Sequence, residues 1–433
     1  RKMCIRDRAQ VATAQGLSEK YYHSFPVTFW DIYSQSGIPI RIKLSDMGPL
    51  LLSRLMDLSV TQQGVLNLVF KIAHDNGWLL TDIKDLRMLL SYISEKAGQY
   101  EADYGRISSM SVAAIQRQLL GLESDGADVL FGEPSLELGD LLSQKNGQGM
   151  VNILAGSKLM QSPKTFSALL LWLLTQLFSE FPEVGDLSLP KLVLFFDEAH
   201  LLFEHTTAEL LQKIEQVVRL IRSKGVGVYF CTQSPLDLPE VILGQLGNRI
   251  QHALRAYTPK DQKNVKAAAQ TFRANVDLNV EEAISTMGVG EALISFLDDK
   301  GTPQPVTRAH IMLPASCLTP LTEQEVAACA KQSSLYTKYA HRVDNFSASE
   351  AIEKIKSTMT TVKSEKALDE DRRKSQTNKV GKDEIRDVFS KGSINVATGF
   401  LRGLFGLRKS SRKGMSYDIS NEIGKELKER IRR

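Results

Sequence analysis

The sequence predicts an α/β fold with a mainly parallel sheet, a helical insertion and a basic carboxyl-terminal tail. Three observations indicate this fold. Residues 192–196 are a run of Leu, Val and Phe, which has the length and composition of a strand buried on both faces. A strand–helix–strand pattern follows up to Thr232. Upstream, residues 45–131 have apolar side chains at helical spacing over most of their length.

The first 24 residues are expected to be a truncated or artefactual start. Met3–Arg8 reads MCIRDR, which resembles translated sequencing-adapter read-through rather than protein. Two short strands are then expected over Val27–Tyr33 and Ile38–Leu44, joined by a glycine-containing turn. We therefore assign residues 25–44 to the start of the core.

The helical insertion is assigned to residues 45–131. Helices are expected over Ser45–Asp57 and Thr61–Asp75, where apolar residues recur at helical spacing. Lys84–Phe131 is expected to be mostly helical, with a break at Tyr104–Ser109.

The remainder of the core is assigned to residues 132–314. A short strand is expected at Val151–Leu154, and a hydrophobic helix at Pro163–Phe181 leads towards the apolar run. The most apolar part of that helix is shorter than the roughly 20 residues that a membrane span requires. No transmembrane segment and no secretory signal is therefore predicted.

The acidic pair Asp197-Glu198 follows the apolar run directly. In open α/β sheets, ligands bind at the carboxyl ends of the strands. Two adjacent carboxylates at that edge suit a magnesium-nucleotide site, in which one holds the metal and the other orients or deprotonates a water. This pattern is typical of a Walker B strand, although an acidic pair alone also fits a simple cap of the next loop.

A second strand, Val226–Thr232, ends in Gln233, so this glutamine should stand beside the acidic pair at the same sheet edge. A polar residue there can contact the γ-phosphate or the attacking water, the role called a sensor. Gln233 also fits the simpler role of a strand-end hydrogen bonder.

Arg249 precedes another expected strand, Ile250–Tyr257. An arginine near a nucleotide edge can stabilise charge on the transferring phosphate, in its own subunit or in a neighbour. The neighbouring Arg255 is an alternative for this role, and either residue also fits an ordinary surface arginine.

A phosphate-binding loop of the form G-x-x-x-x-G-K-[ST] is absent from the 433 residues. Two interpretations follow, an inactive ATPase or a fragment whose phosphate loop lay upstream. We favour the fragment, which by itself is expected to bind ATP weakly or not at all.

The composition is ordinary for a cytoplasmic protein, with 42% hydrophobic residues, 24% charged residues and a formal net charge of +4. The four cysteines have no C-x-x-C spacing, so neither a zinc site nor a disulfide framework is indicated. The histidines at 200 and 205 are one residue away from the spacing of a metalloprotease motif, which argues against zinc there as well.

The end of the chain changes in character. Strands are expected at Gly288–Phe296 and Val306–Met312, and a helical extension is assigned to 315–346. Residues 347–433 are assigned to a charged linker and basic tail, because their last 33 residues contain ten Lys or Arg against four Asp or Glu. Such a tail suits nucleic-acid phosphates, an acidic lipid surface or a partner protein, or it simply solvates the chain.

Several of these segments together resemble the HerA-FtsK superfamily, and more closely the bacterial HerA-like helicase-type ATPases. The matching segments are FFDEAH, the helix ending in IRSKGVGV, the strand end TQSP, LGQLGNRIQHALRAYTPKDQ and GVGEALISFLD. The DEAH letters also suggest a superfamily 2 helicase, but the residues around Arg249 lack the second glycine-arginine pair of its Q-x-x-G-R-x-G-R motif. The residues around Arg249 also lie too close in sequence to the DEAH letters for a separate second domain to fit between them.

The resemblance implies a RecA-like P-loop NTPase core, ATP and Mg²⁺ as cofactors, ring-shaped oligomers, often hexamers, and ATP-driven movement on DNA. It implies that Asp197 is the magnesium-side carboxylate, Glu198 the catalytic base, Gln233 the sensor and Arg249 the candidate finger. A protein of a different class remains as the alternative, a non-translocating NTPase-fold scaffold or partner-regulated switch. The two hypotheses differ in their response to Glu198→Gln, which should abolish the DNA-stimulated ATPase activity of a motor but leave the partner binding of a scaffold unchanged.

Overall fold

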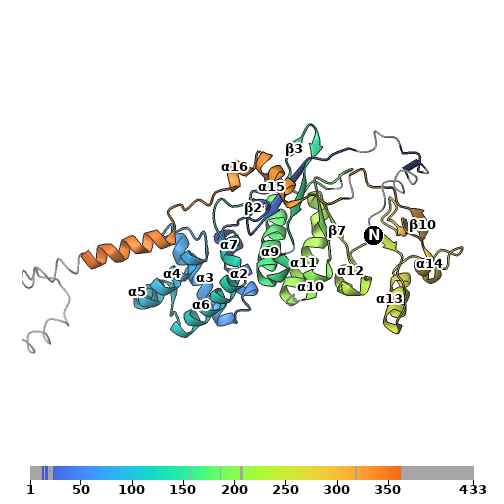
Figure 1. Cartoon of the computed structure of the whole chain (residues 1–433). Coiled ribbons are helices and arrows are strands. Elements are labelled where there is room, and N and C mark those ends of the chain that lie inside the picture. The colour runs from blue at the N-terminus through green and yellow to red at the C-terminus, as the bar shows by residue number, and fades with distance from the viewer. Residues whose placement is uncertain are drawn as a thin grey trace, which may run out of the picture. The chain divides into compact units, whose positions relative to one another are not determined.

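The computed structural model divides the chain into two compact units, residues 1–356 and residues 357–433. The structure describes residues 12–13, 15–17, 23–156, 158–185, 187–204, 208–316 and 319–361 (Figure 1). The adapter-like start and the basic tail lie outside these residues. The elements below all belong to the first unit.

The first sheet has the order β2-β1-β5 and is parallel throughout. It contains β1 (Val27–Asp31), β2 (Ile38–Pro39) and β5 (Val151–Leu154), so the second strand is shorter than the sequence predicts. Gly37 lies in the turn between β1 and β2, where an added Cβ would come within 2.8 Å of the Trp30 carbonyl carbon. Only glycine therefore allows the chain to return so closely along β1.

Helices form over most of the segment assigned to the helical insertion, with the predicted break at residues 105–108. Gly105 ends the helix before this break at φ 84°, a backbone conformation that favours glycine. Ser59 and Asp82 each cap a helix through a reciprocal capping box. The helices are α2 (Leu44–Leu55), α3 (Val60–Asp75), α4 (Ile83–Glu95), α5 (Ala97–Tyr104), α6 (Ser109–Ser124) and α7 (Ala127–Leu130).

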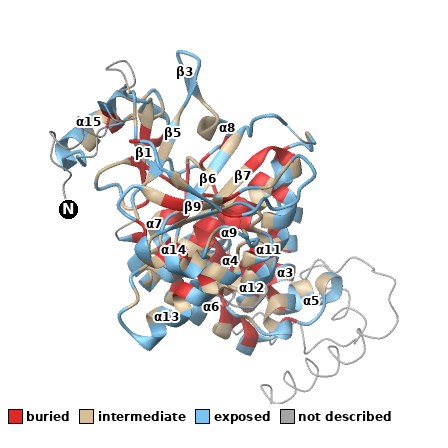
Figure 2. Cartoon of the chain, turned by 90° about the vertical axis from the view of Figure 1, so that its right-hand side faces the viewer, coloured by how far each residue is buried: buried red, intermediate tan, exposed pale blue. Residues whose placement is uncertain are grey.

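Helix α9 (Pro163–Glu180) connects the insertion with the second parallel sheet. It packs against α2 on one side and against α11 (Ala208–Leu220) on the other, and its apolar residues form part of the main core (Figure 2). Before it, α8 (Leu138–Leu141) and the hairpin of β3 (Gln144–Lys145) and β4 (Gln148–Gly149) lead into β5.

The second sheet pairs β6 (Leu192–Phe196) with β7 (Val226–Phe230) in parallel. Its inner face packs on the main core, but its outer face is open: Phe195 is 67% exposed and Tyr229 is 51% exposed. Their rings stack on each other with centroids 4.6 Å apart. The prediction that this strand is buried on both faces is therefore wrong, because no described element covers the outer side.

The third sheet is antiparallel and has its own small core. It contains β8 (Arg249–His252), β9 (Glu291–Ser295) and β10 (Thr307–His310), with α13 (Pro259–Gln270) and α14 (Val280–Thr286) packed beside it. The strand predicted over Ile250–Tyr257 ends at His252. Beyond it, the Leu254 amide donates to the Ile284 carbonyl and the chain packs on this core instead.

Residues 323–351 form a carboxyl-terminal strap that returns to the first half of the chain. Its helices α15 (Glu323–Gln332) and α16 (Tyr336–Tyr339) pack on β1 and β2 and lie within the segment 315–346 assigned to a helical extension. The fully buried Tyr339 meets Trp30 edge to face, and Arg41 donates to its carbonyl oxygen. Among the described residues, no helix is long and apolar enough to cross a membrane.

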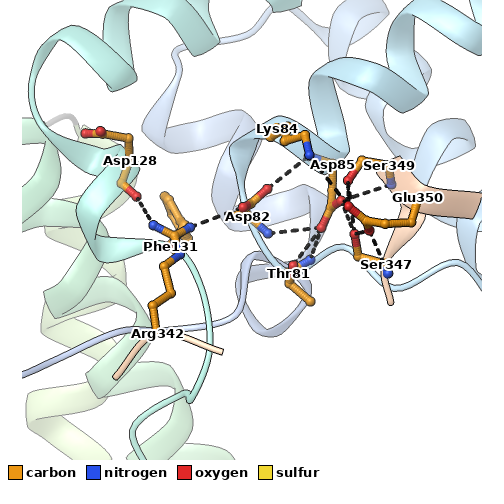
Figure 3. A network of polar contacts seen from close by, with 10 residues as sticks. All are labelled: Thr81, Asp82, Lys84, Asp85, Asp128, Phe131, Arg342, Ser347, Ser349 and Glu350. Atoms are coloured by element: carbon orange, nitrogen blue, oxygen red, sulfur yellow. Dashed lines mark hydrogen bonds and ion pairs between the residues drawn. The ribbon is translucent and has the colours of Figure 1, made fainter. Parts of the chain in front are cut away.

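The end of the strap enters a network of polar contacts at the start of α4 (Figure 3). Arg342 donates to Asp82 at 3.2 Å and to the Phe131 carbonyl at 3.0 Å. The carboxylate of Asp85, only 1% exposed, accepts hydrogen bonds from the Ser347 hydroxyl and the Ser349 amide. These hydrogen bonds tie the strap to the helical insertion.

Candidate active site at the end of the second parallel sheet

Asp197 and Glu198 leave the carboxyl end of β6 in a turn that precedes the short helix α10 (His200–Glu204). Glu198 adopts φ 49°, in the left-handed region that residues with a Cβ rarely occupy. Its amide donates to Asp197 Oδ1 at 3.0 Å, which supports this turn. A strained backbone of this kind costs about 1–2 kcal/mol and is often found where a side chain must be aimed at a ligand.

Gln233 leaves the end of the neighbouring strand β7 and meets Glu198, as the sequence predicts. Its Nε2 lies 3.3 Å from Glu198 Oε2 and 3.5 Å from Oε1. The two strands continue their pairing past their ends, because the Cys231 amide donates to the Phe196 carbonyl and the Ala199 amide to the Cys231 carbonyl. The parallel register therefore sets the carboxylate and the amide side by side.

The loop after β7 is held by a second carboxylate. Asp237 accepts hydrogen bonds from the Thr232 hydroxyl at 3.1 Å and from the Ser234 amide at 3.0 Å, and Ser234 in turn caps the following turn. Gln233 stands between these two anchored residues. The site prediction missed Asp237, although the pattern S-P-x-D after a strand is a recognisable capping sequence.

The electrostatic setting of the acidic pair suits a hydrated cation. Asp197 is exposed and the Glu198 side chain is 45% exposed. Mg²⁺ keeps several waters and usually takes only one or two carboxylates from the protein, so this pair fits it. Burial, and then the charge of Asp197, raise the pKa of the Cys231 thiol. The thiol beside the pair is therefore neutral near pH 7.

His200 is a further neighbour of Glu198. Its Nδ1 lies 3.4 Å from Glu198 Oε2, on α10 immediately after the turn. Sequence reasoning considered this histidine only as a zinc ligand and did not include it in the site. Its position two residues after Glu198, in a tight turn, could have indicated that the two side chains lie close together.

Arg249 does not meet the acidic pair in the described part of the chain. Its guanidinium is half-buried at the start of β8, where Nη2 lies 3.5 Å from the Leu243 carbonyl, and burial lowers its pKa. Arg255 donates to the carbonyls of Ser285 and Met287 and is therefore engaged within its own module. The finger role of Arg249 stays a prediction.

Comparison with known sequences gives one family. A sequence profile described as "Helicase HerA-like C-terminal" matches residues 4–429. A curated relative, the DNA double-strand break repair helicase HerA of Sulfolobus acidocaldarius, is 32% identical over 99 residues. That stretch covers 23% of this chain and 19% of the relative, so the chain spans about a fifth of that protein's length.

Solved structures resemble the chain only distantly. The plasmid coupling protein TrwB in complex with ADP and Mg²⁺ has a TM-score of 0.47 at 11% identity, covering 75% of this chain and 84% of its own. VirB4 of Thermoanaerobacter pseudethanolicus has a TM-score of 0.41 at 16% identity, covering 72% and 79%. These values are too low to bear on function.

Proposed function

We propose that this chain, which belongs to the helicase HerA-like C-terminal family, carries the catalytic edge of a magnesium-dependent ATP hydrolase. The observation that supports this most directly is the meeting of Glu198 and Gln233 at the carboxyl ends of two adjacent parallel strands. Ligands of open α/β sheets bind at that edge.

Each side chain has a role that follows from its chemistry. The exposed carboxylate of Asp197 would hold Mg²⁺ through water. Glu198 would accept the proton of the attacking water, while Gln233 would orient that water and sense the γ-phosphate. Arg249 would act as a finger on the nucleotide of a neighbouring copy, since within its own chain it faces the Leu243 carbonyl. When bound, Mg²⁺ would neutralise charge on the phosphates.

The phosphate-binding loop is proposed to come from outside these 433 residues, which contain no such motif. The outer face of β6 and β7 supports this proposal. Val193, Phe195 and Tyr229 leave it apolar and exposed, and β7 pairs only with β6 in the described part of the chain. A strand and helix flanking a phosphate loop would cover this face and complete the pairing.

The complete protein is further proposed to be a DNA-translocating ring in the cytoplasm, with a hexamer as the expected state. This part of the proposal rests on the family and on the need for a second copy to bring Arg249 to a nucleotide. The HerA relative is named as a DNA repair helicase, which is consistent with DNA as the track.

The test uses a longer polypeptide that includes a phosphate loop upstream of this chain. Glu198→Gln should lower the ATP hydrolysis rate by about 10²- to 10⁴-fold without weakening ATP binding, because it removes only the proton acceptor. The matched control is Glu101→Gln, the same change at an exposed position on α5. Hydrolysis that survives Glu198→Gln, or that falls equally with the control, would rule out this role.

A second measurement tests whether the phosphate loop is external. The 433-residue chain itself should show little or no ATP binding in a calorimetric titration with Mg²⁺, and tight binding would refute the external loop. Replacement of Glu198 then separates the motor from the scaffold alternative. A scaffold would keep its partner binding when Glu198 is replaced, whereas a motor would lose DNA-stimulated hydrolysis.

A further inference from the structure

Helix α13 presents a row of lysines that form no ion pair with a carboxylate in the described part of the chain. Lys260, Lys263 and Lys266 are all exposed, and none of them forms an ion pair with the described residues. Much of α13 is coloured as exposed in Figure 2. Other described lysines do lie within 4 Å of a carboxylate: Lys43, Lys71, Lys84, Lys338 and Lys356.

The geometry of the helix sets these lysines on one face. Positions three residues apart turn by about 60° relative to each other, so the row spans about 120° of arc and about 9 Å of helix length. Val265 and Ala268 lie on the opposite face and are buried in the small core beside the third sheet. Packing therefore fixes the orientation of α13 and directs the lysines to solvent.

The single acidic residue of α13 does not neutralise the row. Asp261 accepts hydrogen bonds from the amides of Tyr257 and Thr258 as part of the capping box. Hydrogen bonding with the Thr258 side chain and from the Thr258 and Tyr257 amides, and last the charge of Lys260, keep the pKa of Asp261 below its usual range. Asp261 therefore offsets at most one of the three charges. Tyr257, at the start of the row, is 86% exposed and offers an aromatic face.

We propose that this lysine face of α13 binds the phosphodiester backbone of DNA. The inference rests on the proposed function and assigns a contact surface to its nucleic-acid track. At 3.4 Å of duplex axis per phosphate of one strand, three successive phosphates cover about 7 Å, which flexible lysine side chains spread over about 9 Å can reach. Flexible ammonium groups contact phosphates without reading bases, so binding here is independent of sequence. The exposed ring of Tyr257 suits stacking against an unpaired base.

The test compares two triple variants of the 433-residue chain. Lys260→Gln/Lys263→Gln/Lys266→Gln removes the row, and Lys145→Gln/Lys164→Gln/Lys331→Gln removes the same charge from exposed lysines on three separate elements. Binding of fluorescein-labelled 20-nucleotide single strands and duplexes of arbitrary sequence is measured by anisotropy at several salt concentrations. Circular dichroism checks that both variants are folded.

The row variant should bind about tenfold or more weakly, and its slope of log K against log salt should fall by about 2 to 3. The scattered control should retain most of the affinity and slope. Equal loss in both variants, or no loss in the row variant, would overturn the proposal. Failure of the unmodified chain to bind DNA at low salt would also overturn the proposal. Binding of the lysine row to poly-glutamate but not to DNA would overturn it as well and would indicate an acidic protein partner.

These outcomes are separate from those that decide the catalytic proposal. The basal rate of ATP hydrolysis and its dependence on Glu198 are measured without DNA, so the lysine face can fail while the catalytic edge is retained. Conversely, DNA binding that depends on the row in a protein whose hydrolysis ignores Glu198 would keep this surface and reject the catalytic edge.

Discussion

Two clusters of carboxylates in this chain are built in opposite ways. Asp85 is buried, and donors satisfy both of its oxygens: Thr81 and the Asp82 amide on Oδ2, Ser347 and Ser349 on Oδ1. Asp197 and Glu198 are largely exposed, and the glutamate meets its nearest side-chain donor, Gln233, at a long 3.3 Å.

This difference distinguishes a carboxylate that stabilises the fold from a pair that is available to a ligand. A carboxylate whose lone pairs are all occupied within the protein can bind no cation, and its removal leaves buried donors unpaired. A carboxylate pair with open lone pairs contributes little to stability and is available to a ligand. The network at Asp85 should therefore control folding of the strap, and the pair at β6 should control function.

The largest effect is expected from Asp85→Asn. The amide offers one acceptor oxygen where the carboxylate offered two, and its NH₂ would face hydrogen-bond donors. The free energy of unfolding should fall by about 2–4 kcal/mol, because unsatisfied buried groups cost about 1–3 kcal/mol each. Urea denaturation followed by circular dichroism measures this change. A loss below about 1 kcal/mol would show that the network is rearranged without cost.

Acid should release the same strap. Hydrogen bonds from Ser347, whose amide donates to Oε2, and from the Ser349 hydroxyl hold the pKa of Glu350 at about 2. Burial raises the pKa of Asp85, but hydrogen bonds from the Ser347 hydroxyl and from Thr81 outweigh it and lower that pKa. Both pKa values lie below the usual range near 4. The stability that these groups contribute is therefore complete above pH 4 and is lost as pH falls from about 4 towards 2.

The measurement is the urea midpoint at pH 7, 5, 4, 3 and 2. Because other carboxylates titrate in the same window, the comparison is with Glu350→Gln, whose curve should fall less steeply between pH 4 and 2. Parallel curves would mean that Glu350 is not paired in the folded chain.

A smaller effect, of opposite sign, is expected at the candidate active site. Glu198→Gly relieves the left-handed backbone at φ 49° but adds freedom to the unfolded chain. The net gain in the free energy of unfolding should be up to about 1 kcal/mol, whereas Glu198→Ala, which keeps a Cβ, should give none. If glycine and alanine behave alike, no strain is stored in this turn.

The local features of the fold were predictable, because they depend on neighbours in the sequence. The run 192–196 predicted β6, the loss of helical spacing predicted the break near residue 105, and the position of Gln233 just past a strand parallel to β6 predicted its meeting with Glu198. The Asp85–Ser347 contact joins residues 262 positions apart, and sequence periodicity carries no information about such pairs. For the same reason, the exposure of Phe195 and the isolation of Arg249 from the acidic pair were visible only in the structure.

The smallest effect is expected from Asp197→Asn, the same substitution as the largest. The side chain is exposed, and the hydrogen bond that Oδ1 accepts from the Glu198 amide can be kept by the asparagine oxygen. The change also removes one of two adjacent negative charges, which repel each other when no cation is bound. The free energy of unfolding should therefore stay within about 0.5 kcal/mol of its original value. A loss comparable to that of Asp85→Asn, measured by the same urea titration, would place Asp197 among the structural carboxylates and remove the contrast on which the catalytic assignment depends.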